Sequence, residues 1–69
     1  MQTKIQKITS ITSGLHTQIA KQSWLSFQTI GKAIAWNRVE HNTKIEIYIA
    51  LLKMWIIKQW ECNAYTLFE

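Results

Sequence analysis

The chain has 69 residues, enough for one domain, 1–69, whose limited core needs efficient helical packing, a partner subunit or a staple. Eight basic residues against four acidic ones give a net charge of +4. Cys62 is the single cysteine, which excludes a disulfide bond within the chain. Because Cys62, His16 and His41 lack the spacing of zinc ligands, we expect no metal and no cofactor.

Nothing in the sequence predicts secretion or membrane insertion. Polar residues follow Met1, where a signal peptide would have an apolar segment. The most apolar stretch, 45–60, is interrupted by Glu46, Lys53 and Lys58 and contains no uncharged run of the roughly 20 residues that a membrane span needs. We therefore expect a cytoplasmic protein without a membrane partner.

Positive charge is concentrated in the first half of the chain. Residues 1–39 contain five basic residues and no acidic residue, whereas residues 40–69 contain three lysines and four glutamates. The two parts therefore carry charges of +5 and −1. Such a basic region is typical of a surface that faces phosphates or anionic lipid, and a solvated basic face without a partner has the same composition.

The first predicted element is a helix around residues 5–11. Ile5, Ile8 and Ile11 recur at every third position, which suits one face of a helix and does not suit a strand. Gly14 is then expected at the left-handed C′ position that ends many helices.

Two further helices are predicted within residues 17–37. Thr17 is a suitable N-cap for the first, and Ser26 is a suitable N-cap for the second after a break at 24–26. Gly31 within the second helix costs about 1 kcal/mol relative to alanine, which indicates close approach to something or a weak helix. The expected inner faces are Ile19, Ala20 and Ser23 in the first helix, and Ile30, Ala33 and Ile34, extending to Asn37, in the second.

The last long element is a predicted helix at 43–62, after a loop at 37–42. Thr43 and Glu46 have the spacing of a capping box. The alternation of residues 44–49 also fits a strand, but the capping box and the apolar residues that follow favour a helix. The expected fold is therefore an all-α bundle of three or four helices.

The helix at 43–62 is apolar on more than one face, which predicts a second packing partner. A copy of the same chain is the simplest partner, so we expect a homodimer. Tyr65 and Phe68 are expected to fold back onto this helix. The residues predicted for the dimer interface are Ile49, Leu52, Trp55 and Ile56.

Residues 17–32 resemble the helix-turn-helix pattern of bacterial and phage regulators. Ile19 and Ala20 occupy the places of an apolar residue followed by alanine, where the small side chain lets two helices cross closely. Trp24 stands at the turn position that often holds glycine. The other matches are Leu25 after the turn, Ser26 at the cap of the recognition helix, and Thr29 with Ile30 inside it.

More of the chain, residues 8–57, is similar to the LuxR/GerE-type four-helix effector domain. Gly14 with Leu15 resembles its glycine turn, and the start of the segment at 44–51 resembles its dimerising last helix. The Lys-Leu-x-Val segment that usually precedes that helix is missing here. The resemblance implies a small DNA-binding regulator.

The resemblance also implies that a recognition helix at 27–37 enters the major groove of duplex DNA. Gln28 then suits adenine, Lys32 suits guanine or a phosphate, and Phe27 suits a thymine methyl group. Each of these residues is also compatible with an ordinary exposed helix face. The expected DNA contacts are Thr17, Gln18, Lys21, Ser26, Phe27, Gln28, Thr29, Lys32 and Arg38.

The sequence therefore predicts a small transcriptional regulator that binds duplex DNA. No set of nucleophile, base and acid is recognisable, so we do not expect an enzyme. The alternative is a phage-type inhibitor or adaptor whose apolar C-terminal helix binds a host protein. A membrane-active peptide is disfavoured because polar residues are abundant in the basic half. The residues expected to anchor the core and interfaces are Trp24, Trp36, Trp55 and Trp60.

Overall fold

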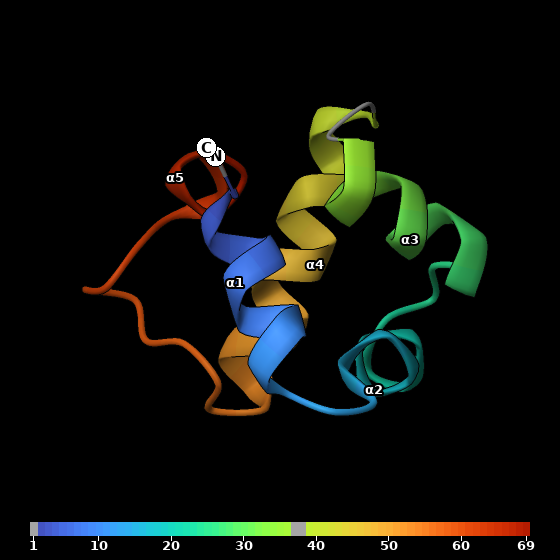
Figure 1. Cartoon of the computed structure of the whole chain (residues 1–69), viewed down its shortest axis with the longest axis horizontal. Helices are drawn as coiled ribbons and strands as arrows, with labels where there is room; N and C mark the ends of the chain where they lie inside the picture. The colour runs from blue at the N-terminus through green and yellow to red at the C-terminus, as the bar shows by residue number, and fades with distance from the viewer. Residues whose placement is uncertain (1, 37–38) are drawn as a thin grey trace.

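The computed structural model describes residues 2–36 and 39–69, and every regular element in these two ranges is a helix (Figure 1). The all-α class predicted from the sequence is thus confirmed. Four of the helices have eight residues or more, and the fifth is a single turn. The helices are α1 (Lys4–Ile11), α2 (Leu15–Gln22), α3 (Phe27–Trp36), α4 (His41–Lys53) and α5 (Ala64–Leu67).

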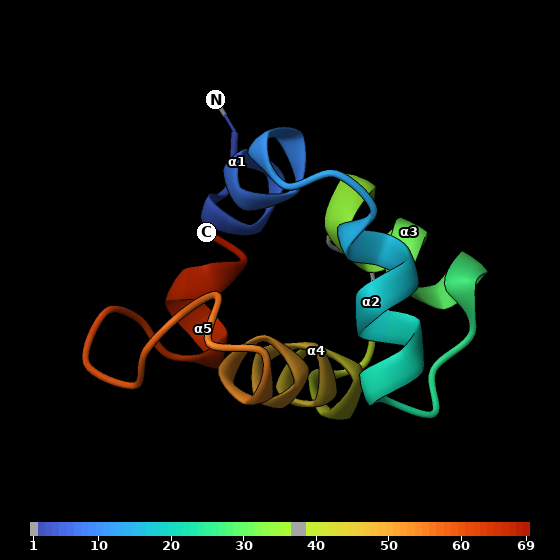
Figure 2. The same cartoon turned by 90° about the horizontal axis from the view of Figure 1, so that it is seen from below.

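Helix α4 lies between two groups of helices. On one side it contacts α2 and α3, and on the other side it contacts α5, while α1 closes the bundle by contacting both α3 and α5 (Figures 1 and 2). The beginning of α1 lies beside the end of the chain, because the Lys4 amide donates a hydrogen bond to the Glu69 carbonyl at 3.3 Å. None of the described helices is long and apolar enough to cross a membrane.

Aliphatic side chains fill the core. Ile5 of the predicted isoleucine row is buried, but Ile8 is half-buried and Ile11 is exposed. The row turns away because three residues fall about 60° short of a full helical turn. The buried residues are Ile5, Leu15, Ile19, Ile30, Ala33, Ile34, Ile47, Ala50, Leu51, Ile57, Leu67 and Phe68.

The four tryptophans are all largely exposed, so the prediction that they anchor the core is wrong. Each lies in a turn, in a loop or at the end of a helix, where the chain leaves the bundle and no neighbouring helix covers the ring. An interface role for these residues stays a prediction. The residues concerned are Trp24 in a turn, Trp36 at the end of α3, Trp55 directly after α4, and Trp60 in the following loop.

A capping box that was not predicted begins α1. The Gln6 amide donates to the Thr3 hydroxyl at 3.2 Å, and the Thr3 amide donates to Gln6 Oε1 at 3.0 Å. Gln6 Nε2 also donates to the carbonyls of Ile34 at 2.9 Å and Ala35 at 3.3 Å. One side chain therefore caps α1 and satisfies carbonyls at the end of α3, which positions α3 against α1.

Gly14 has the expected left-handed conformation, with φ of 72°, but it is the N-cap of α2 and not the C′ residue of α1. Helix α1 already ends at Ile11, and the C-cap Thr12 is extended. Because Gly14 turns the chain directly into Leu15, Thr17 lies in the first turn of α2 and the prediction that it is the N-cap is wrong.

Helix α4 begins two residues before the predicted capping box. Glu40 is an extended N-cap whose side chain makes no capping hydrogen bond, and the Thr43 amide donates to the Glu40 carbonyl at 3.1 Å. Thr43 and Glu46 both lie inside the helix, whose N-cap is Glu40, so the predicted capping box with Thr43 as the N-cap is wrong. Residues 44–49 are helical, which overturns the strand alternative.

Helix α4 ends at Lys53, so the prediction of a helix through residue 62 is wrong. Trp55 is left-handed, with φ of 61°. Its amide donates to the Leu52 carbonyl at 3.1 Å, and the Ile56 amide donates to the Leu51 carbonyl, also at 3.1 Å. These two bonds form a Schellman motif, which satisfies the carbonyls at the end of the helix and turns the chain away.

The chain then folds back along α4. Tyr48 in α4 donates from its hydroxyl to the Cys62 carbonyl at 3.0 Å. The Tyr65 ring stacks on the ring of His41 at 5.2 Å between centroids, and Phe68 is buried. The prediction that Tyr65 and Phe68 fold back onto this helix is confirmed.

Candidate nucleic-acid interface

Helices α2 and α3 are joined by residues 23–26 and contact each other directly (Figure 2). Ile19 on α2 and Ile30 on α3 are fully buried, and Ala20 is half-buried. Ala20 packs against the same core, and the close crossing of the two helices at this residue stays a prediction. Residues 17–36 therefore form two separate helices and not one continuous rod. Asn37, the last residue of the predicted unit, lies outside the described residues.

The backbone is extended where the turn between the two helices begins, at Ser23. The Ser23 amide and hydroxyl both donate to the Ile19 carbonyl, at 2.9 and 2.8 Å, which ends α2. Trp55 is the one non-glycine residue with positive φ in the described part of the chain, so Trp24 is not left-handed. The turn thus differs from the usual glycine turn of the family that it resembles, and it accommodates the bulky Trp24 by pointing the side chain into solvent.

Ser26 caps α3, as predicted. Its hydroxyl oxygen accepts from the Thr29 amide at 3.1 Å, and the hydroxyls of Ser26 and Thr29 share a hydrogen bond of 2.8 Å. The side chains of Ser26 and Thr29, two of the expected DNA contacts, are therefore hydrogen-bonded to each other.

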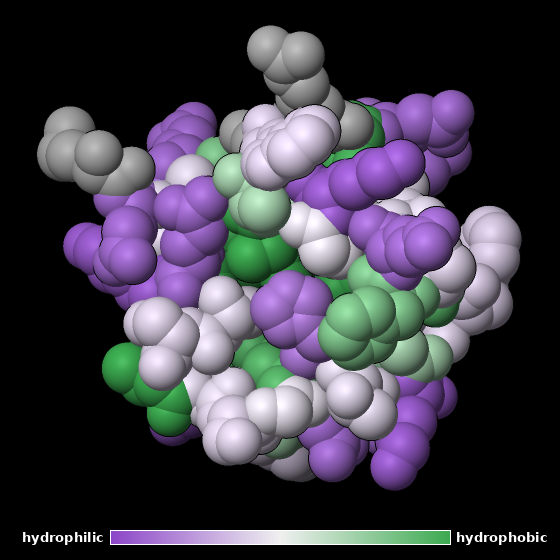
Figure 3. All heavy atoms as spheres, turned by 45° about the vertical axis from the view of Figure 1, so that its right-hand side comes forward, coloured by the Kyte–Doolittle hydropathy of each residue, from purple (hydrophilic) through white to green (hydrophobic). Residues whose placement is uncertain are grey.

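The outer side of α3 consists of two parallel rows of residues at i, i+4 spacing. This spacing places the members of each row one above another along the helix. Figure 3 turns this side of the molecule forward and shows hydrophilic side chains spread over it, with strongly apolar surface confined to smaller areas between them. One row is Phe27, Gly31 and Ala35, and the other is Gln28, Lys32 and Trp36.

Most of the predicted DNA contacts are accessible. Thr29 is half-buried, and Arg38 lies outside the described residues. The structure thus places seven of the expected contacts on the surface of α2, the turn and α3. The exposed members are Thr17, Gln18, Lys21, Ser26, Phe27, Gln28 and Lys32.

Two contacts that support this surface were not predicted. The ring of His16 on α2 lies 5.6 Å from the ring of Phe27, measured between centroids, and thus links α2 to the beginning of α3. Gln6 holds the other end of α3 through the carbonyls described above. Only the Thr3–Gln6 capping box could have been predicted, because it follows a short sequence pattern. The other contacts join residues that are distant along the chain, so no local pattern indicates them.

Charge differs between the sides of the α2–α3 unit. Lys21 and Lys32 are exposed on α2 and α3, which contain no acidic residue. A hollow of about 330 Å³ lies between the turn, which contributes Trp24 and Leu25, and the beginning of α4, and its charged lining residues are Glu40 and Glu46. An anion is therefore attracted to the outer side of α3 and repelled from the side of the turn that faces α4.

Gly31 is not required by packing, because a Cβ atom added there would meet nothing within 4 Å. We expect Gly31→Ala to raise the free energy of unfolding by about 0.5–1 kcal/mol and the melting temperature by about 2–8 °C. Thermal unfolding followed by circular dichroism measures this change. Gly14→Ala is the matched control and should be destabilising, because Gly14 has a φ of 72°. A destabilised Gly31→Ala protein would show that α3 is packed differently.

In the described part of the chain, no group of three or more His, Cys, Asp and Glu side chains could hold a metal ion. No protein-family model, no curated protein and no solved structure gives a significant match to the chain. The resemblance of residues 17–32 to helix-turn-helix regulators therefore stays a prediction.

Proposed function

We propose that the protein binds duplex DNA through α2 and α3 and acts as a small cytoplasmic transcriptional regulator. The observation that supports this proposal best is the outer side of α3. There, Gln28 and Lys32 project into solvent one turn apart, and no acidic side chain lies on the same helix. The opposite side of α3 is buried, so this outer side is the one that a ligand can reach.

The shape and chemistry of α3 suit the major groove. An α-helix with its side chains is about 10–12 Å in diameter, and the major groove is about 12 Å wide. The Gln28 amide can pair with an adenine edge, and Lys32 can reach guanine or a phosphate. Gly31 lies in the neighbouring row and has no side chain, which permits the helix backbone to approach the bases closely.

Helix α2 supplies groups suited to the phosphate backbone. Lys21 provides a charge that attracts DNA of any sequence, and Thr17 and Gln18 are short polar donors on the exposed side of the same helix. Such contacts position a protein on the duplex, whereas contacts from α3 to base edges select the sequence.

The proposal predicts binding to duplex DNA that depends strongly on salt. If two or three cationic side chains neutralise phosphates, the affinity should fall by about 10–40-fold between 50 and 200 mM salt. A gel-shift titration of mixed-sequence duplex DNA at these two concentrations measures the effect. The proposal would be contradicted if the DNA showed no shift at the lower salt concentration, or if the affinity were the same at both salt concentrations.

The alternative function, binding of a host protein by an inhibitor or adaptor, is favoured by a different observation. Trp55 and Trp60 are exposed after α4, on a part of the surface that DNA binding does not use. A tight complex with one host protein, together with no DNA shift at low salt, would support this alternative.

A further inference from the structure

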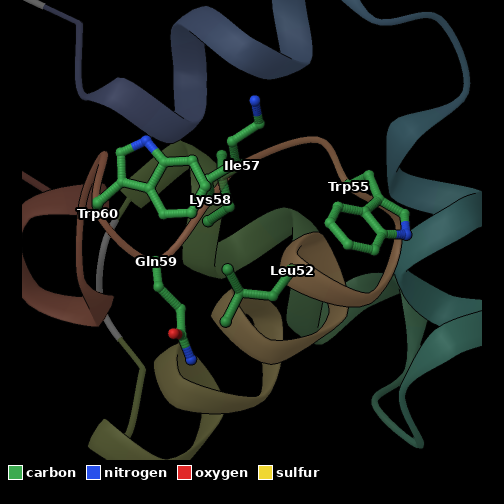
Figure 4. A pocket seen from close by; sticks show the side chains of 6 residues that line it. All are labelled: Leu52, Trp55, Ile57, Lys58, Gln59 and Trp60. Atoms are coloured by element: carbon green, nitrogen blue, oxygen red, sulfur yellow. The ribbon is translucent and has the colours of Figure 1, made fainter.

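We propose that a second copy of the chain docks at the end of α4, so that the Trp55 side chain of each copy enters a groove of the other. The groove has a volume of about 280 Å³. Figure 4 shows Leu52 and Ile57 between Trp55 on one side and Trp60 on the other. Lys58 and Gln59 complete the lining. This surface adds to the proposed DNA binding and does not depend on it.

The backbone of Trp55 is the first reason to infer a partner. Its φ of 61° is in the left-handed region, which costs a residue with a Cβ atom about 1–2 kcal/mol. The side chain is 81% exposed, so burial within one copy does not offset that cost. Glycine would be favoured here if monomer stability alone mattered. A strained residue with a large exposed ring instead indicates a role in binding.

The groove and the protruding ring belong to the same surface, as a two-fold contact requires. In a two-fold contact both copies use the same patch, so the protruding ring of one copy meets the groove of the other. Trp55 borders the groove, and a groove of about 280 Å³ is large enough for an indole ring. The two features are thus self-complementary.

The two exposed tryptophan rings supply part of the area that a stable dimer needs. Aromatic side chains bury about 150–250 Å² each, so Trp55 and Trp60, which are 81% and 80% exposed, together offer roughly 240–400 Å². A stable interface buries about 800 Å² per partner, and the two rings supply a third to a half of it. Half-buried Leu52 and the stems of Lys58 and Gln59 add to this area.

Lys58 is the charged residue among those that line the groove, and its ammonium lies 5.4 Å from the centroid of the Trp60 ring. This cation–π contact keeps the charge beside Trp60 within each copy.

The proposed contact leaves α3 accessible. In both Figure 1 and Figure 2, the segment that follows α4 runs along the side of the molecule away from α3. Two copies joined there would each keep the outer side of α3 uncovered. Association and DNA binding can therefore be tested separately.

Sedimentation equilibrium of the full chain over a range of concentrations tests the proposal. We expect a reversible equilibrium between monomer and dimer. Trp55→Gly should weaken association at least tenfold and, at a concentration where both proteins are monomeric, raise the melting temperature. Trp60→Ala should also weaken association. Trp24→Ala, which removes an equally exposed ring (83%) from the α2–α3 turn, should leave association unchanged.

The inference would be overturned by a wild-type chain that stays monomeric at all concentrations, by a Trp55→Gly protein that associates like the wild type, or by loss of association in Trp24→Ala alone. A complex formed only with another protein would likewise overturn it. Loss of DNA binding with association intact would refute the proposed function and leave the dimer contact standing.

Discussion

Leu51→Ala should lower the free energy of unfolding by about 2–5 kcal/mol, because it removes a side chain that is 0% exposed and leaves a cavity. For a chain of 69 residues this loss approaches the whole stability of a small domain. We therefore expect a protein that is largely unfolded at 25 °C, which urea denaturation followed by circular dichroism would show.

Ile49→Ala is the matched control for Leu51→Ala, because it lies two residues away in α4 and its side chain is 37% exposed. It should cost less than about 1 kcal/mol. The pair also tests the secondary structure of this segment. In a strand, residues 49 and 51 would share one face and respond alike, whereas in a helix they point in nearly opposite directions. Equal losses of stability would contradict the helix.

The double substitution Gln28→Ala/Lys32→Ala should weaken binding to duplex DNA by at least about tenfold and reduce the salt dependence by about one unit of slope. Gln28 is expected to contact a base edge, and Lys32 a base or a phosphate. Both side chains are exposed, so the free energy of unfolding should change by no more than about 0.5 kcal/mol for each substitution. Fluorescence anisotropy with labelled duplex DNA and thermal unfolding measure the two effects.

Gln2→Ala/Lys53→Ala is the control for this prediction, since it removes the same two functional groups from exposed positions outside α2 and α3. It should retain nearly the whole affinity of the wild type. If the Gln28/Lys32 protein binds as tightly as this control, α3 is not the recognition helix. If both double variants lose affinity equally, binding depends on net charge alone and not on one face of the protein.

Local sequence patterns determined the helical class and the interior of the helices. The spacing of Ile30, Ala33 and Ile34 predicted the buried side of α3 and thereby the exposed side with Gln28 and Lys32, because a helix repeats every 3.6 residues. Ser26 was correctly predicted as the cap, since its hydroxyl reaches an amide only three residues away. These features depend on neighbours along the chain.

Helix ends and the exposure of the aromatic rings were decided by the tertiary structure. Helix α4 ends at Lys53 because the Schellman turn at Trp55 redirects the chain. Ile57, Leu67 and Phe68 can then complete the core. No local sequence pattern predicts this burial. Likewise, Gln6 reaches α3 across 28 residues of sequence.

Composition and periodicity thus determined which segments are helical and which side of α3 faces solvent. Only the packed bundle decided where α2 and α4 begin, where α4 ends and which large side chains remain on the surface. The physical reason is the separation of the interacting residues along the chain. Hydrogen bonds within a helical turn are specified by adjacent residues, whereas burial depends on segments that meet only after the chain has folded.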